Sequence, residues 1–332
     1  MTRISVGDAS LTNILARQSA DLRGQVQRAS QEVATGRHSD LGAALRGDFS
    51  PLLAIDASLA RLSAYKSNTA DAAFQTAAQQ SAISGLSQLA SGVSTTLLGA
   101  KNATPVQIDT LAADARGRLA SAIGLLNTQA SGRAVFSGVA TGTVPLGSVE
   151  DMLTALQTAA AGATSAGQVT AAVTGWFADP LGFGAFYQGG GPRSSTPIAQ
   201  GEAAEIPTTA MDPALRDTLA GFAMAALLDR GVLAGDATER GRLAQQAGQQ
   251  LASTEDARTT LQARIGTVEA RIEAARTRNS AEETALGILR SDIGSVDPYE
   301  AGTRLEAIQS QLESLYLVTA RVSRLSLAEY LS

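Results

Sequence analysis

The chain of 332 residues contains no cysteine and a single histidine, His38, and only 4% of its residues are aromatic. Without cysteine there can be no disulfide bond and no thiolate metal ligand. A Ser-His-Asp triad cannot be assembled around His38, and no other carboxylates stand at a useful spacing. Most apolar residues are alanine or leucine, which suits thin helical bundles better than a thick α/β core. The sequence therefore predicts neither an enzyme nor a cofactor or metal site.

Charge and hydropathy exclude further classes of partner. The net charge is −5, and Lys66 and Lys101 are the only lysines. No basic stripe is present, so we expect no nucleic acid as partner. No run of eighteen apolar residues exists, so we expect no membrane insertion. Residues 1–20 lack the basic and apolar regions of a cleaved signal peptide. We expect a protein that stays in the cytoplasm or leaves it by a route without signal cleavage.

Local signals divide the chain into long helices. Four prolines follow a good N-cap residue, at Pro51, Pro105, Pro213 and Pro298, which is a strong signal for a helix start. Glycines such as Gly36 mark the ends. We predict a mainly α protein with helices over residues 8–35, 51–98, 105–131, 213–230, 236–293 and 298–330.

Several of these helices carry a coiled-coil pattern. From Leu261 to Ile293, stripe positions recur at steps of four and three, and only Asn279 and Glu282 interrupt the apolar seam. For 51–98 and 236–293 such a seam is most simply a buried helix face. The stripes at the two ends have only each other inside one chain, so we favour burial against other copies. The predicted assembly interface consists of Leu11, Leu15, Leu22, Val26, Leu305, Ile308, Leu312, Leu315, Val322, Leu325 and Leu327.

The middle of the chain differs from its flanks. It holds the only tryptophan, Trp176, among several phenylalanines, and two short helices are predicted over 151–161 and 168–177. A hairpin is predicted that turns at Gln200-Gly201. We expect a small inserted α+β outer domain. The predicted division is an N-terminal assembly helix (1–45), two halves of an elongated helical rod (46–137 and 211–294), the outer domain (138–210) and a C-terminal assembly helix (295–332).

Five segments together resemble the flagellin superfamily, and within it the hook-associated protein 3 family of hook–filament junction proteins; the first is Arg3-Ile4-Ser5, which leads into an amphipathic helix. Glu32–Arg37 resembles the family's Ser/Thr-Gly-Lys/Arg turn, and Gly132–Gly138 resembles the segment that leads into the outer domain. Asp297–Glu313 is similar to the final helix, and Ser323–Leu331 resembles the terminal Leu-Ser-Leu-x-x-Tyr/Phe-Leu motif. The resemblance covers roughly 1–138 and 213–332, and its specificity lies in the order of the motifs.

The resemblance implies a fold and a role. The terminal helices would pair as antiparallel coiled coils in the inner tube of an extracellular flagellum, after unfolded type III export without a cleaved signal. Implied partners are copies of the chain, a hook-associated protein on the hook side, flagellin on the filament side, and an export chaperone on the C-terminal helix. A filament flagellin is the alternative, although the chain lacks the family's Asn-rich N-terminal region. A cytoplasmic coiled-coil adaptor is the alternative of another class.

Overall fold

The computed structural model describes residues 6–331, and side chains over residues 13–324. Two compact units are present, one formed by residues 1–61 with 281–332 and the other by residues 62–280. The long helices α3 and α10 contribute to both. The elements in chain order are α1 (Val6–Thr35), α2 (Leu41–Ala44), α3 (Ser50–Leu98), the 3-10 turn η1 (Gly99–Asn102), α4 (Pro105–Leu126), β1 (Gln129–Ala130), β2 (Arg133–Ala134), α5 (Val149–Ala159), α6 (Ala166–Ala178), α7 (Phe183–Phe186), β3 (Thr196–Ala199), β4 (Glu202–Ala204), α8 (Pro213–Leu227), α9 (Ala237–Ser253), α10 (Glu255–Gly294) and α11 (Pro298–Leu331).

The mainly α prediction is confirmed, and several of the predicted helix starts are formed as capped ends. Thr104 caps α4 in a reciprocal capping box with Gln107. Asp212 caps α8 through the backbone N–H of Ala214, and Asp297 accepts from the backbone N–H of Tyr299 at 2.7 Å. Each side chain satisfies a backbone donor that the helix itself leaves free, so these boundaries follow from a few neighbouring residues.

Two predicted helix boundaries are wrong. Helix α4 ends at Leu126 rather than near residue 131, because Asn127 turns away to exchange two hydrogen bonds with the backbone of Leu146, at 2.9 and 3.0 Å. The predicted helix 236–293 is interrupted at Thr254. The Thr254 hydroxyl lies 3.0 Å from the carbonyl oxygen of Leu251, in the local side-chain bonding that competes with helical hydrogen bonds.

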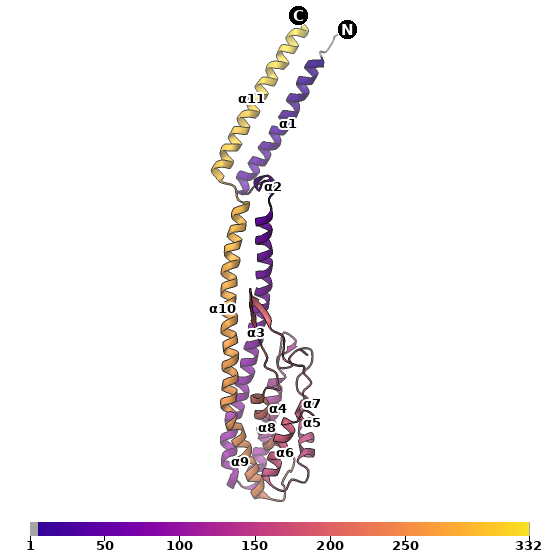
Figure 1. Cartoon of the computed structure of the whole chain (residues 1–332), viewed down its shortest axis with the longest axis vertical. Helices are drawn as coiled ribbons and strands as arrows, with labels where there is room; N and C mark the ends of the chain where they lie inside the picture. The colour runs from indigo at the N-terminus through magenta and orange to yellow at the C-terminus, as the bar shows by residue number, and fades with distance from the viewer. Residues whose placement is uncertain (1–5, 332) are drawn as a thin grey trace. The chain divides into compact units, whose positions relative to one another are not determined.

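In the first unit, α1 and α11 lie side by side, and the start of α1 is at the same end of the pair as the end of α11 (Figure 1). The pair is therefore antiparallel, as predicted. Two backbone hydrogen bonds join the segment that follows α1 to the segment that precedes α11. His38 N–H donates to the carbonyl oxygen of Gly294, and Val296 N–H donates to the carbonyl oxygen of Gly36. The chain turns at Gly36 with a φ of +67°, a conformation that glycine adopts without steric cost.

The inserted region contributes to the larger apolar core of the second unit. Helices α4, α8 and α9 supply Leu119, Phe222 and Leu251, and the inserted segment supplies Leu153, Phe177 and Phe183 to the same cluster. The aromatic side chains of Trp176, Phe177, Phe183 and Phe186 contact one another, mostly edge to face. They do not form a separate core of their own as we had expected, because α6 packs directly on α8 and α9. The predicted domain boundaries stay a prediction.

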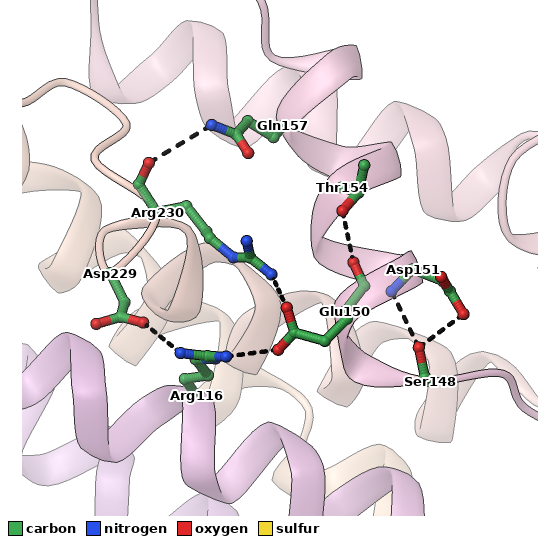
Figure 2. A network of polar contacts seen from close by, with 8 residues as sticks. All are labelled: Arg116, Ser148, Glu150, Asp151, Thr154, Gln157, Asp229 and Arg230. Carbon is green, nitrogen blue, oxygen red and sulfur yellow. Dashed lines mark hydrogen bonds and ion pairs between the residues drawn. The ribbon is translucent and has the colours of Figure 1, made fainter.

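A network of charges also ties the inserted region to its flanks (Figure 2). Glu150, in the first turn of α5, accepts from Arg116 of α4 at 2.5 Å and from Arg230, which follows α8. Arg116 also pairs with Asp229 at 3.2 Å. Hydrogen bonds from Arg116, together with the charges of both arginines, outweigh desolvation and lower the pKa of Glu150. By bonding to both arginines, the Glu150 carboxylate holds the start of α5 against α4 and the segment that follows α8.

The predicted hairpin is present and packs on the long helices. β3 and β4 pair antiparallel, with Thr196 opposite Ala204, and Gly201 in the turn has a φ of +73°. Ile198 and Ile206 join Ala72 of α3 and Ile272 of α10 in a second apolar cluster. The amide of Asn279, which is 5% exposed, donates to the carbonyl oxygen of Ile198 at 2.7 Å. This contact explains the polar residue in the seam of α10.

Candidate functional site: the terminal helix pair

The contact between α1 and α11 is a narrow apolar seam. Leu15 and Leu22 of α1 are buried against Leu315 of α11, and Ile308 and Leu312 pack beside them partly exposed. The seven-residue step from Leu15 to Leu22 and the three- and four-residue steps from Ile308 to Leu315 keep each set on one helix face. The sequence pattern thus forms an antiparallel coiled coil within a single chain.

The structure brings five of the eleven predicted interface residues together at this seam. Besides the five seam residues, Val26, Leu305 and Val322 are half-buried. Leu11, Leu325 and Leu327 lie outside the residues whose side chains are described. Since Leu15, Leu22 and Leu315 are buried against the partner helix of their own chain, these leucines cannot offer their whole apolar area to a second copy. Their role in assembly stays a prediction.

One polar contact helps to hold α1 and α11 in register. Arg23 Nε donates to the Tyr316 hydroxyl at 2.8 Å, and the guanidinium lies 5.7 Å from the centre of the tyrosine ring. This bond is the largest cause of the lowered pKa of Tyr316. Because a planar guanidinium bonds in a directed way, the contact disfavours sliding of one helix along the other.

A buried carboxylate closes the other end of the pair. Glu32 is 8% exposed, and it accepts from the backbone N–H and the hydroxyl of Ser39, both at 3.0 Å. Arg304 of α11 lies 3.3 Å from its other oxygen, and His38 Nδ1 lies 4.0 Å away. Burial raises the pKa of Glu32, but the Ser39 hydrogen bonds and the charges of Arg304 and His38 lower it more. Glu32 therefore connects α1, the following loop and α11 as an anion.

The sequence pattern did not predict this cluster, in which His38 is half-buried. A signal was available, since Glu32 lies on the line of stripe positions that includes Leu22 and Ala29. A carboxylate on a buried stripe needs donors nearby. The donors come from Ser39 and from Arg304, which is far away in sequence, so the pattern shows the need but not the partners.

The outward faces of the pair carry a second set of apolar side chains, which do not belong to the seam. Leu317 is 67% exposed, Ile14 56%, Val318 49% and Val33 43%. They lie off the stripe positions, so a heptad pattern in the sequence does not identify them. Large apolar side chains that remain exposed on a paired helix are available to a further partner.

Across residues 6–331, no helix is long and apolar enough to cross a bilayer. Over the same residues, His, Cys, Asp and Glu side chains form no group of three or more that could hold a metal ion. The terminal pair remains the candidate functional site.

Comparison with known proteins agrees with this geometry. Residues 245–331, which include α11, match the family described as the bacterial flagellin C-terminal helical region. The fold is similar to the crystal structure of Bacillus cereus FlgL, with 15% sequence identity and a TM-score of 0.52 over 72% of this chain and 100% of that one. A Vibrio parahaemolyticus protein assigned as a flagellar hook-associated protein matches with 14% identity and a TM-score of 0.49, over 75% and 99% of the two chains.

A sequence search of curated proteins gave no match. The family match includes the C-terminal helix that pairs with α1. This chain therefore carries a flagellin-type C-terminal helical region on a mainly α fold similar to that of FlgL.

Proposed function

We propose that this chain is a structural, non-enzymatic subunit of the bacterial flagellum that joins the hook to the filament and assembles through its terminal helices. The observation that carries the proposal is the position of the flagellin-type region. It ends in α11, and α11 forms an antiparallel seam with α1. The similarity to FlgL, over 72% of this chain, supports the junction role over that of a filament flagellin.

A deletion strain tests this role against the flagellin alternative. Loss of a junction protein leaves hooks in place and releases flagellin into the medium, because the filament has no base to grow from. Loss of a filament flagellin leaves an intact junction and no secreted excess. Retained filaments with no flagellin in the medium would contradict the junction role.

The proposed contact surface between copies combines two parts. One is the set of outward apolar side chains Ile14, Leu317 and Val318, and the other is the half-exposed edge of the seam, including Leu312. Each leucine-sized side chain buried between copies contributes about 1.5–3 kcal/mol. Since every copy in a closed ring or tube repeats the contact, a modest loss per copy is multiplied through the assembly.

Matched leucine substitutions separate assembly from folding. Leu317→Asp should prevent incorporation into flagella while leaving the monomer's stability unchanged, because the side chain is 67% exposed in the monomer. Leu22→Asp should instead disrupt the seam of the monomer itself. Leu181, 85% exposed in the other unit, provides the control: Leu181→Asp should change neither property. Normal incorporation of the Leu317→Asp chain would exclude this surface.

The remaining partners follow from the same proposal. Neighbours would be a hook-associated protein on the hook side and flagellin on the filament side, in an extracellular location reached by type III export. An export chaperone would cover Leu305, Ile308, Leu312 and Leu315. Because Leu315 is buried against α1 in the folded chain, chaperone binding requires α11 to separate from α1. Co-purification with a chain truncated after residue 297 would contradict that binding site.

A further inference from the structure

A polar pocket of about 410 Å³ lies in the second unit. One wall is α3, with Asn68, Asp71 and Phe74, and the opposite wall contains Arg133 from β2 and Arg193 from the segment before β3. Its volume falls in the range of small-molecule sites, which begins at about 300 Å³. Neither the flagellin-type region nor the seam makes use of it.

Arg193 supplies the first indication of a ligand. Its Nη2 atom is buried, and no group of the described chain accepts a hydrogen bond from it. A buried guanidinium N–H without an acceptor is costly, and such atoms in folded proteins are usually satisfied by something bound. An acceptor held beside Arg193 would satisfy this N–H group.

The charges of the pocket define the acceptor further. Burial lowers the pKa of Arg193, and the neighbouring positive charge of Arg133 lowers it again, while Asp71 has the opposite effect. Two guanidinium groups and one carboxylate leave a single excess positive charge. A carboxylate placed between the two arginines would relieve their repulsion and could accept paired N–H groups, the geometry that guanidinium suits best.

The rest of the lining favours a hydroxylated, partly apolar ligand. Amide groups of Asn68 and Gln75 and hydroxyl groups of Ser131 and Thr141 offer both donors and acceptors. The ring of Phe74 is 55% exposed at the same pocket and supplies an apolar surface. A pyranose has a rim of hydroxyl groups and a C–H face that can lie on the electron-rich face of an aromatic ring.

We propose that this pocket binds the uronic-acid type of sugar, with its carboxylate on Arg133 and Arg193, its hydroxyl groups on the amides and hydroxyls of the lining, and its C–H face on Phe74. The expected ligand is a small acidic saccharide. Its binding does not depend on the proposed role of the chain in the flagellum.

Isothermal titration calorimetry of the full chain with glucuronate, glucose, acetate and inorganic phosphate tests this assignment. We expect glucuronate to bind one to one and at least about tenfold more tightly than each of the other three. Arg193→Gln and Arg133→Gln should each weaken glucuronate binding by about tenfold or more, as expected for loss of a charge-assisted pair. Arg276→Gln, at an arginine that is exposed on α10, should leave binding unchanged.

Each other outcome overturns part or all of the assignment. No binding of glucuronate, or equal binding by the Arg193→Gln chain, would exclude the site. Acetate or phosphate binding as tightly as glucuronate would show a general oxyanion site and contradict the sugar. Arg133 is exposed, so Arg133→Gln provides a test in a folded chain even if Arg193→Gln does not fold.

Discussion

Replacing Arg258 with alanine should destabilise the unit of residues 62–280 strongly, whereas replacing it with methionine should not. Arg258 is 1% exposed, and its guanidinium bonds to hydroxyl groups rather than to a carboxylate. Nη1 donates to Thr254 at 2.6 Å and to Thr218 at 3.0 Å, and Nε donates to Ser87 at 3.3 Å. Burial accordingly lowers the pKa of this guanidinium.

The magnitude follows from what each substitution leaves behind. The hydroxyl groups of Thr218 and Thr254 lie 2.7 and 3.0 Å from backbone carbonyl oxygens, so they retain partners without Arg258. Truncation to alanine therefore mainly leaves a void, which costs about 2–5 kcal/mol for a side chain of this length. Methionine fills most of the void and removes a desolvated charge, so its cost should be below about 1.5 kcal/mol.

Urea unfolding followed by far-UV circular dichroism measures the difference. We expect the midpoint of Arg258→Ala to fall by about 1 M or more and that of Arg258→Met to stay near wild type. Arg276→Ala, at an exposed position of the same helix, controls for loss of an arginine. If methionine destabilises as much as alanine, the charge itself stabilises the core and the reasoning is refuted.

Three further substitutions test particular contacts by the same unfolding assay. Gly248→Ala should cost about 1–3 kcal/mol of stability, because an added Cβ would lie 2.8 Å from the backbone nitrogen of Leu98. At the control position, the Cβ of Gly117→Ala meets open space, so this change should stabilise the chain slightly. Equal effects of the two substitutions would refute the close packing of α9 on α3. Asn279→Leu restores the apolar seam but leaves the Ile198 carbonyl without its donor, so it should cost about 1–3 kcal/mol; stabilisation would contradict that contact. Because the pKa of Glu32 is lowered on folding, its contribution is present above the ordinary value of 4.5 and is lost as the pH falls below it; Glu32→Gln should remove that part of the pH dependence, and an unchanged profile would refute it.

Helix boundaries could be predicted where they depend on adjacent residues. Thr104 with Pro105 and Asp212 with Pro213 define their own helix starts, because a cap and a fixed φ act locally. The end of α4 depends on hydrogen bonds between Asn127 and Leu146, which are distant in sequence. Such a boundary cannot be inferred from the residues beside it.

The apolar seams show the same limit of prediction from sequence. Periodicity correctly predicts the buried face of α10 at Leu261, Ile265 and Ile272, since the spacing alone places these residues on one side. Periodicity does not say which element covers a face, so Asn279 looks like a defect until the hairpin carbonyl is seen beside it. For the same reason the terminal stripes were expected to meet other copies, although Leu22 and Leu315 meet within one chain.

The inserted region was judged by composition, which indicates an aromatic cluster but not its neighbours. Phe177 and Phe183 do contact one another, as the composition suggested. The same core continues into α8 through residues such as Phe222. Whether a cluster belongs to a separate domain depends on packing between distant segments, which composition does not report.

The most direct test of the central claim is the number of copies of this chain per flagellum, measured by quantitative mass spectrometry of sheared and purified flagella. A junction subunit that assembles through its terminal helices should be present in a small, fixed number that does not change with filament length. The Leu317→Asp chain should be missing from the same preparations. A copy number that rises in proportion to filament length would identify a filament subunit, and absence of the wild-type chain would contradict a role in the flagellum altogether.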